Sequence, residues 1–240
     1  MRISYELTMP ASSDLMRQLR RADPDRFFCT LFAPPEARET LALLYLFNHE
    51  LARAREVASE PLLALIRLNW WREVVQGQVK SHELATPLGA ALRAGRLEAG
   101  DLAGLIEARE VEAEPEIADL GAFLAYARGT AGKLARIAGK VLGADSDAVE
   151  DLGTAYGIAG ILRAAPFLQA QGRSLLPADG TPRSALEAHA RALLKAKAPH
   201  AALAAALPAV YARRDLGRHK AERGLGDRVA VLRAAITGRL

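Results

Sequence analysis

Apolar residues recur along the chain at the three-to-four-residue spacing of helices, and proline and glycine divide this pattern into blocks. The block that begins at Glu36 predicts the clearest helix. One face of it carries Leu41, Leu44, Tyr45, Asn48, Leu51, Ala52 and Arg55. Because this face is apolar at its start and polar at its end, we expect the far end to open into a cavity or solvent.

The other blocks predict helices over residues 13–22, 25–33, 84–95, 101–114, 116–142, 145–171, 184–197, 200–214 and 228–236, with Gly143 ending one of them. A further helix opens at Ser59, with Pro61 in its first turn. Its predicted apolar face is Leu62, Leu65, Ile66, Asn69, Trp70 and Val74. No segment reads as a strand. The expectation is an all-α protein with one domain over residues 1–240, in which residues 1–24 are a candidate for a loosely ordered N-terminal segment.

Small and aromatic residues add two local predictions. Gly153, Gly157 and Gly160 share one side of the helix over 145–171, where they allow either close helix packing or room for a ligand. Trp70 and Trp71 are adjacent and therefore point in different directions. We expect one of them in the core and the other in a groove or partner contact.

Charge favours an anionic partner without identifying it. The net charge is +4 and the pI about 9.4, which suits phosphate, diphosphate, a membrane surface or nucleic acid, and equally suits solvated helix faces. The stretch from Tyr211 to the end has eight Lys or Arg against three acids, so it is either a solvated face or a contact surface for a membrane or an assembly partner. Aromatic residues form only 5% of the chain, which disfavours nucleic acid as a partner.

Cysteine and hydropathy indicate a compartment. Cys29 is the single cysteine, so neither an intramolecular disulfide nor a cysteine metal site can form. No signal peptide and no run of about 18 apolar residues is evident. The expectation is a cytoplasmic protein whose membrane contact, if any, is peripheral and at the inner face of the plasma membrane.

Short catalytic motifs fail on inspection. The stretch HELAR over 49–53 begins like the zinc-protease H-E-x-x-H, but Arg53 replaces the second histidine. The stretch GTAGK over 129–133 lacks the first glycine and the final Ser or Thr of a phosphate loop, since Ala127 and Leu134 stand there. The motifs therefore predict no catalytic residue and no metal ligand.

Four segments in order resemble the squalene and phytoene synthases, which join isoprenyl diphosphates head to head. The segments are FFCTLFAPPEARETLALLYLFNHELAR (27–53), SEPLLALIRLNWWREVVQG (59–77), ARGTAGKLARI (127–137) and YGIAGILRAAPFLQAQGRSLLP (156–177). The resemblance implies an isoprenoid synthase-type helical bundle with a central cavity. Enzymes of this family hold Mg²⁺ with two aspartate motifs on facing helices, because hard cations neutralise a departing diphosphate.

The acids of both motifs are mostly absent here. The resemblance places Ala52, Arg53 and Glu56 at the acidic positions of the first motif. It places Ala164 and Leu168 at the aspartates of the second motif and Gly160 at its asparagine. Glu56 alone keeps a carboxylate. The chain thus resembles the branch of the family that lacks the aspartate motifs and contains a mitochondrial respiratory complex I assembly factor.

Three hypotheses follow. The first is a catalytically inactive family member that acts as a binding or assembly factor for a respiratory complex I subunit or assembly intermediate, without a cofactor. The second is an active isoprenyl diphosphate transferase with unusual Mg²⁺ ligands. The third is a metal-free binder of a lipid or isoprenoid diphosphate. The candidate ligand-binding residues are Asn48, Arg53, Arg55, Glu56, Arg163 and Arg173, and Arg67 is a further cation for the third hypothesis. The alternative for these arginines is pairing with Glu50, Glu56 and Glu73 on helix surfaces.

Overall fold

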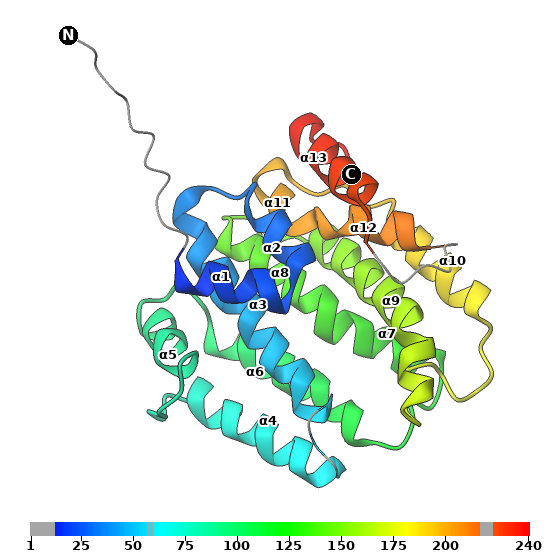
Figure 1. The fold of residues 1–240 in the computed structure, drawn as a ribbon, viewed down its shortest axis with the longest axis horizontal. Coiled ribbons are helices and arrows are strands. Elements are labelled where there is room, and N and C mark those ends of the chain that lie inside the picture. Colours follow the sequence, from blue (N-terminus) through cyan, green and yellow to red (C-terminus); the bar gives the residue numbers. More distant parts are fainter. Residues whose placement is uncertain (1–12, 57, 59, 217–222) are drawn as a thin grey trace.

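A computed structural model of the chain describes residues 13–56, 58, 60–216 and 223–240. The first part of the chain contains α1 (Asp14–Ala22), α2 (Pro24–Thr30), α3 (Pro35–Glu56), α4 (Pro61–Val75), α5 (Ala85–Arg93), α6 (Ala99–Glu110) and η1 (Val111–Ala113). It continues with α7 (Leu120–Ala127), η2 (Arg128–Gly132), α8 (Lys133–Val141), α9 (Asp147–Ala170), α10 (Arg183–Leu193), η3 (His200–Ala202), α11 (Leu203–Ala206), α12 (Pro208–Asp215) and α13 (Leu225–Thr237). The predicted all-α class is confirmed (Figure 1).

Capping residues set several helix starts. The Ser13 hydroxyl accepts a hydrogen bond from the Met16 N–H, and Asp23 caps α2 through the Arg26 N–H. Within the segment 1–24, for which loose order was one expectation, α1 packs on α3 and buries Met16 and Leu19. Residues 1–12 of that segment, and the predicted cap Ser59, lie outside the described residues.

Two predicted helices are interrupted. The helix expected over 116–142 begins at Leu120, where the Asp119 side chain caps it, and it contains a π-helical turn at Arg128–Gly132. The helix expected over 200–214 is broken before Pro208, because proline has no N–H to continue the helical ladder. Gly143 follows α8 with a φ of +83°, as predicted for a helix end.

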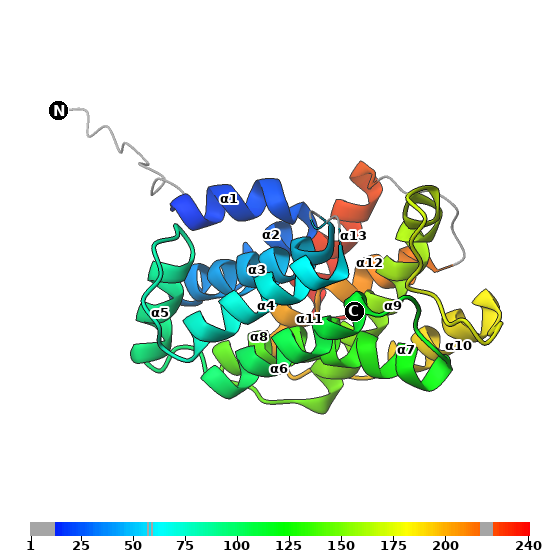
Figure 2. The ribbon, with the colours of Figure 1, turned by 90° about the horizontal axis from the view of Figure 1, so that it is seen from below.

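The long helices α3 and α9 lie at the centre of the bundle (Figures 1 and 2). Residues 40–48 of α3 are all buried, because α1, α2, α4 and α8 pack around them. Helix α9 is covered by α8, α10 and α12 and contacts the π-helical turn. An ideal Cβ on Gly153 would lie 2.3 Å from the Ala135 Cβ, and one on Gly157 would lie 2.6 Å from the Ala131 Cβ. Close packing therefore explains both glycines.

The predicted apolar face of α4 is largely wrong. The face that packs on α3 and α6 carries Ala64, Leu68, Trp71, Val74 and Val75. Leu62, Leu65 and Ile66 lie on the surface instead. Apolar residues surround almost the whole circumference of α4, so their spacing could not define the buried side.

Among the described residues, no helix is long and apolar enough to cross a membrane.

Candidate functional site

A cavity of about 250 Å³ lies between α3 and α9. Its walls are completed by the ends of α2 and α6, by η1, by α7 and the π-helical turn, and by the loop after α9. The lining residues are Arg26, Asn48, Ala52, Glu56, Arg109, Glu112, Tyr126, Thr130, Ala131, Tyr156, Gly157, Gly160, Ile161, Ala164, Leu168, Arg173 and Leu175.

Residues that the sequence resemblance assigns to the two metal motifs line this cavity from α3 and from α9. Ala52 and Glu56 are one turn apart on α3, and Gly160, Ala164 and Leu168 follow one another by single turns on α9. All five line the cavity, so the helical register places the two motif positions opposite each other. An ideal Cβ on Gly160 meets nothing within 4 Å. Gly160 therefore leaves open space in the cavity, whereas Gly153 and Gly157 are packed against neighbouring residues.

These residues do not fit a magnesium cluster. Mg²⁺ requires a near-octahedral set of oxygen ligands. Four of the five positions hold two alanines, a glycine and a leucine, whose side chains have no oxygen, so Glu56 is the single carboxylate among them. Within the described ranges, no three His, Cys, Asp or Glu side chains gather closely enough to hold a metal ion.

Another part of the cavity wall is polar, and its side chains are hydrogen-bonded to one another. Arg109 at the end of α6 donates to Glu112 Oε1 at 2.6 Å, to the Tyr126 hydroxyl at 3.2 Å and to Asn48 Oδ1 at 3.3 Å. The Tyr126 hydroxyl donates to Glu112 Oε1 at 2.7 Å. Burial raises the pKa of Tyr126 far above its usual value, so the phenol stays protonated and acts as a donor. The buried Arg109 Nε has no hydrogen-bond partner among the described residues.

A second cation, Arg26 of α2, also lines the cavity. Its guanidinium stacks over the rings of Tyr45 and Tyr156, with centroid distances of 5.5 Å and 5.0 Å, and pairs with Asp23 at 2.7 Å. Burial also raises the pKa of Tyr156, so this phenol too remains neutral. The cavity therefore combines neutral donors with arginines that are partly neutralised by carboxylates.

The structure separates the candidate residues into two groups. Asn48, Glu56 and Arg173 line the cavity.

The other three lie elsewhere. Arg53 pairs with Glu50 at 3.2 Å on the outer side of α3. Arg55 donates to the backbone carbonyls of Glu112 and Ala58, each at 3.2 Å, and so ties the end of α3 to η1. Arg163 lies 3.5 Å from the Asp215 carboxylate of α12.

Sequence reasoning missed the polar wall. Arg26, Arg109, Glu112, Tyr126 and Tyr156 were not candidates, although each lines the cavity. The available signal was an acid three residues from an arginine, since Asp23–Arg26 and Arg109–Glu112 both form ion pairs at this spacing.

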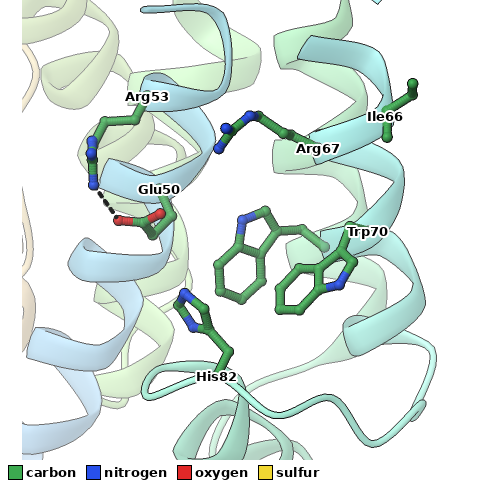
Figure 3. A pocket seen from close by; sticks show the side chains of 7 residues that line it. Glu50, Arg53, Ile66, Arg67, Trp70 and His82 are labelled. Carbon is green, nitrogen blue, oxygen red and sulfur yellow. Dashed lines mark hydrogen bonds and ion pairs between the residues drawn. The ribbon is translucent and has the colours of Figure 1, made fainter. Parts of the chain in front are cut away.

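A second pocket of about 300 Å³ lies outside the bundle, between α3, α4 and the loop that follows α4 (Figure 3). Its lining residues are Glu50, Arg53, Ile66, Arg67, Trp70, Trp71 and His82. Trp71 is buried and Trp70 is half-buried beside it, with ring centroids 4.8 Å apart. This confirms the prediction that one tryptophan joins the core and the other lines a groove.

An all-helical bundle with two long helices facing each other across a central cavity is the isoprenoid synthase fold. The chain belongs to the squalene/phytoene synthase family, whose sequence model matches residues 19–236. The expected family and fold are therefore confirmed.

Two solved structures share this fold. A dehydrosqualene synthase in complex with ligand superposes with a TM-score of 0.74 at 13% identity, covering 93% of this chain and 94% of the other. A squalene synthase from Alicyclobacillus acidocaldarius superposes with a TM-score of 0.64 at 17% identity, with 93% of each chain covered.

The curated relatives are named as assembly factors, whereas the two solved structures are named as synthases. NADH dehydrogenase (ubiquinone) complex I, assembly factor 6, is 28% identical over 170 residues in Mus musculus and 26% identical over 170 residues in Homo sapiens. The matched region is 67% of this chain and 51% of each relative, so the chain spans about half the length of these proteins.

Proposed function

We propose that this protein is a non-catalytic member of the squalene/phytoene synthase family that acts as an assembly factor for respiratory complex I. The observation that carries the proposal is the composition of the cavity wall. Ala52, Gly160, Ala164 and Leu168 line the cavity, and the sequence resemblance assigns them to the positions from which a family enzyme would hold Mg²⁺. The likeness to complex I assembly factor 6 supports the assembly role.

Deletion of the gene tests this role. We expect lower NADH dehydrogenase activity and less assembled complex I on native gels, with unchanged isoprenoid products. Re-expression of the wild type and of Glu56→Gln should restore assembly equally, because the proposed role uses no metal. Normal complex I in the deletion strain would contradict the proposal.

A second candidate function, a metal-free binder of a lipid or isoprenoid diphosphate, is favoured by the cations of the cavity. Arg173 lines the cavity and forms no ion pair with another described residue, and Arg109 keeps one buried Nε–H unpaired. Arginine can hold a diphosphate directly through charge-assisted hydrogen bonds. Binding of farnesyl diphosphate in the presence of EDTA, measured by calorimetry, should then occur and weaken in Arg173→Gln. Absence of binding to the wild type would exclude this function.

We also propose that the protein contacts the membrane surface peripherally through α13. Leu225, Val229, Leu232 and Ile236 form one exposed stripe, while Val231 and Ala234 on the opposite side are buried. The side chains of Arg228 and Arg233 lie on either side of this stripe and are exposed, as in interfacial helices that bind anionic lipid.

Sedimentation with vesicles tests the membrane contact. Vesicles of phosphatidylcholine and phosphatidylglycerol should sediment the wild type, and pure phosphatidylcholine should sediment less of it. Arg228→Gln with Arg233→Gln should lose the difference. Equal sedimentation of the wild type with both vesicle types would contradict the proposed contact.

A further inference from the structure

Helix α4 exposes an apolar face that the fold does not use. Leu62 is 63% exposed, Ile66 57%, Leu63 43% and Leu65 36%. The opposite face of α4 is already buried against α3 and α6. A helix that is apolar on nearly its whole circumference is ordinarily buried on all sides, and adjoining exposed apolar residues are typical of interaction surfaces.

The exposed face of α4 continues into the outer pocket, which gives the surface a concave centre. Trp70 and Trp71 stand edge to face, and the His82 ring lies 5.5 Å and 5.2 Å from them (Figure 3). The Leu84 N–H donates to His82 Nδ1 at 3.1 Å, which helps to hold this ring. Pre-formed aromatic pockets of this kind accept a single anchoring side chain of a partner.

Arginine dominates the charge around this pocket. Arg67 of α4 points across the pocket toward α3, whereas Arg53 of α3 turns away from α4 toward Glu50 (Figure 3). Arg67 forms no ion pair with any described residue, whereas Arg53 pairs with Glu50. The unmatched charge at the mouth is therefore positive, so an acidic partner is complementary to it.

We infer that the α4 groove, defined as Leu62, Leu63, Ile66, Arg67, Trp70 and His82, binds a partner protein through a segment that inserts an apolar side chain at Trp70 and places Asp or Glu beside Arg67. The inference rests on the proposed assembly role and names the surface that would perform it. A second copy of this chain is a poorer occupant, because a two-fold contact over this groove would bring Arg67 close to its own counterpart. A flat bilayer is also a poorer occupant, because it cannot fill a concave pocket.

Photocrosslinking in living cells tests the groove with the complete chain. The photoreactive residue p-benzoylphenylalanine replaces Ile66, and in a control variant it replaces the exposed His189 of α10. We expect position 66 alone to crosslink one protein, through a segment with an apolar residue within one helical turn of Asp or Glu. Arg67→Glu should lower the yield at least about tenfold, since reversing the charge makes the contact repulsive. Crosslinks only to lipid, only to a second copy, or to nothing would overturn the inference.

Complementation separates this inference from the proposed function. The double variant Ile66→Asp with Arg67→Glu should fold normally, because both side chains are exposed, and urea unfolding checks that it does. It should fail to restore complex I in the deletion strain. The variant Leu232→Asp on α13 is the comparison, because it disrupts the proposed membrane contact and leaves the groove unchanged. It therefore distinguishes a loss caused by the groove from a loss caused by membrane release. Full restoration by the α4 variant would refute the groove and leave the assembly role intact. Unchanged complex I on deletion, together with a specific crosslink at position 66, would refute the assembly role and leave the groove intact.

Discussion

Replacing Glu112 by glutamine should destabilise the fold far more than the same change at Glu110, two residues away. Both acids pair with an arginine: Glu112 with Arg109 and Glu110 with Arg72. The side chains of Arg109 and Glu112 are 15% and 6% exposed, whereas those of Arg72 and Glu110 are 31% and 39% exposed. The two substitutions therefore compare the same chemistry at different burial.

The expected magnitudes follow from that burial. Removing one partner of a buried pair leaves an uncompensated charge and costs about 3–5 kcal/mol. We expect the lower end of this range for Glu112→Gln, since the amide oxygen can still accept the hydrogen bond from Tyr126. Glu110→Gln removes an exposed pair and should cost less than about 1 kcal/mol.

Urea unfolding followed by circular dichroism at 222 nm measures both free energies. A third variant, Arg109→Met with Glu112→Leu, should recover part of the loss of Glu112→Gln, because it removes the unpaired charge as well. A loss for Glu112→Gln no larger than that for Glu110→Gln would refute the reasoning. So would a double variant that is less stable than the single one.

Three further predictions use packing and titration. Gly153→Ala should lower the free energy of unfolding by about 2 kcal/mol, because the new Cβ would meet backbone as well as side-chain atoms. Gly160→Ala should raise the free energy of unfolding by up to about 1 kcal/mol, because its Cβ would meet nothing within 4 Å. Urea midpoints that move in the same direction for both variants would contradict this reasoning. Trp71→Ala should cost about 3–5 kcal/mol and Trp70→Ala clearly less, and equal losses would be inconsistent with their different burial. Burial raises the pKa of every described tyrosine, so the folded state holds these protons more tightly and its stability should fall as pH rises above about 10. Absorbance at 295 nm should then show fewer tyrosinates at pH 11 in the folded protein than in urea, and identical titrations would contradict it.

Helical periodicity predicted the helices well where one face is apolar, as in α10, whose buried residues Leu186 and Ala190 are one turn apart. It failed for α4, because a helix with apolar residues on nearly all sides has no distinct face to assign. The π-helical turn at Arg128–Gly132 was also beyond its reach. That turn packs against the glycines of α9, and such a contact depends on tertiary structure rather than on local spacing.

The cavity was predictable along α3 and α9, where the spacing of Ala52 and Glu56 and of Ala164 and Leu168 follows the helical turn. Its polar wall was not, since Arg109 and Tyr126 meet only after α6 and α7 have packed. The sequence also could not show which arginines line the cavity and which pair with acids elsewhere. Arg173 reaches the cavity, but Arg163 turns toward Asp215, because long side chains select their partners in the assembled fold.

The most direct test of the central claim is the response of the purified protein to Mg²⁺ in the presence of farnesyl diphosphate. Calorimetry would measure the affinity for the diphosphate with Mg²⁺ and with EDTA, and chromatography would follow any prenyl product. A cavity whose motif positions are Ala52, Gly160, Ala164 and Leu168 predicts an affinity that Mg²⁺ does not raise, and no product. Tighter binding with Mg²⁺, or formation of a condensed prenyl product, would contradict the claim that metal-dependent catalysis has been lost.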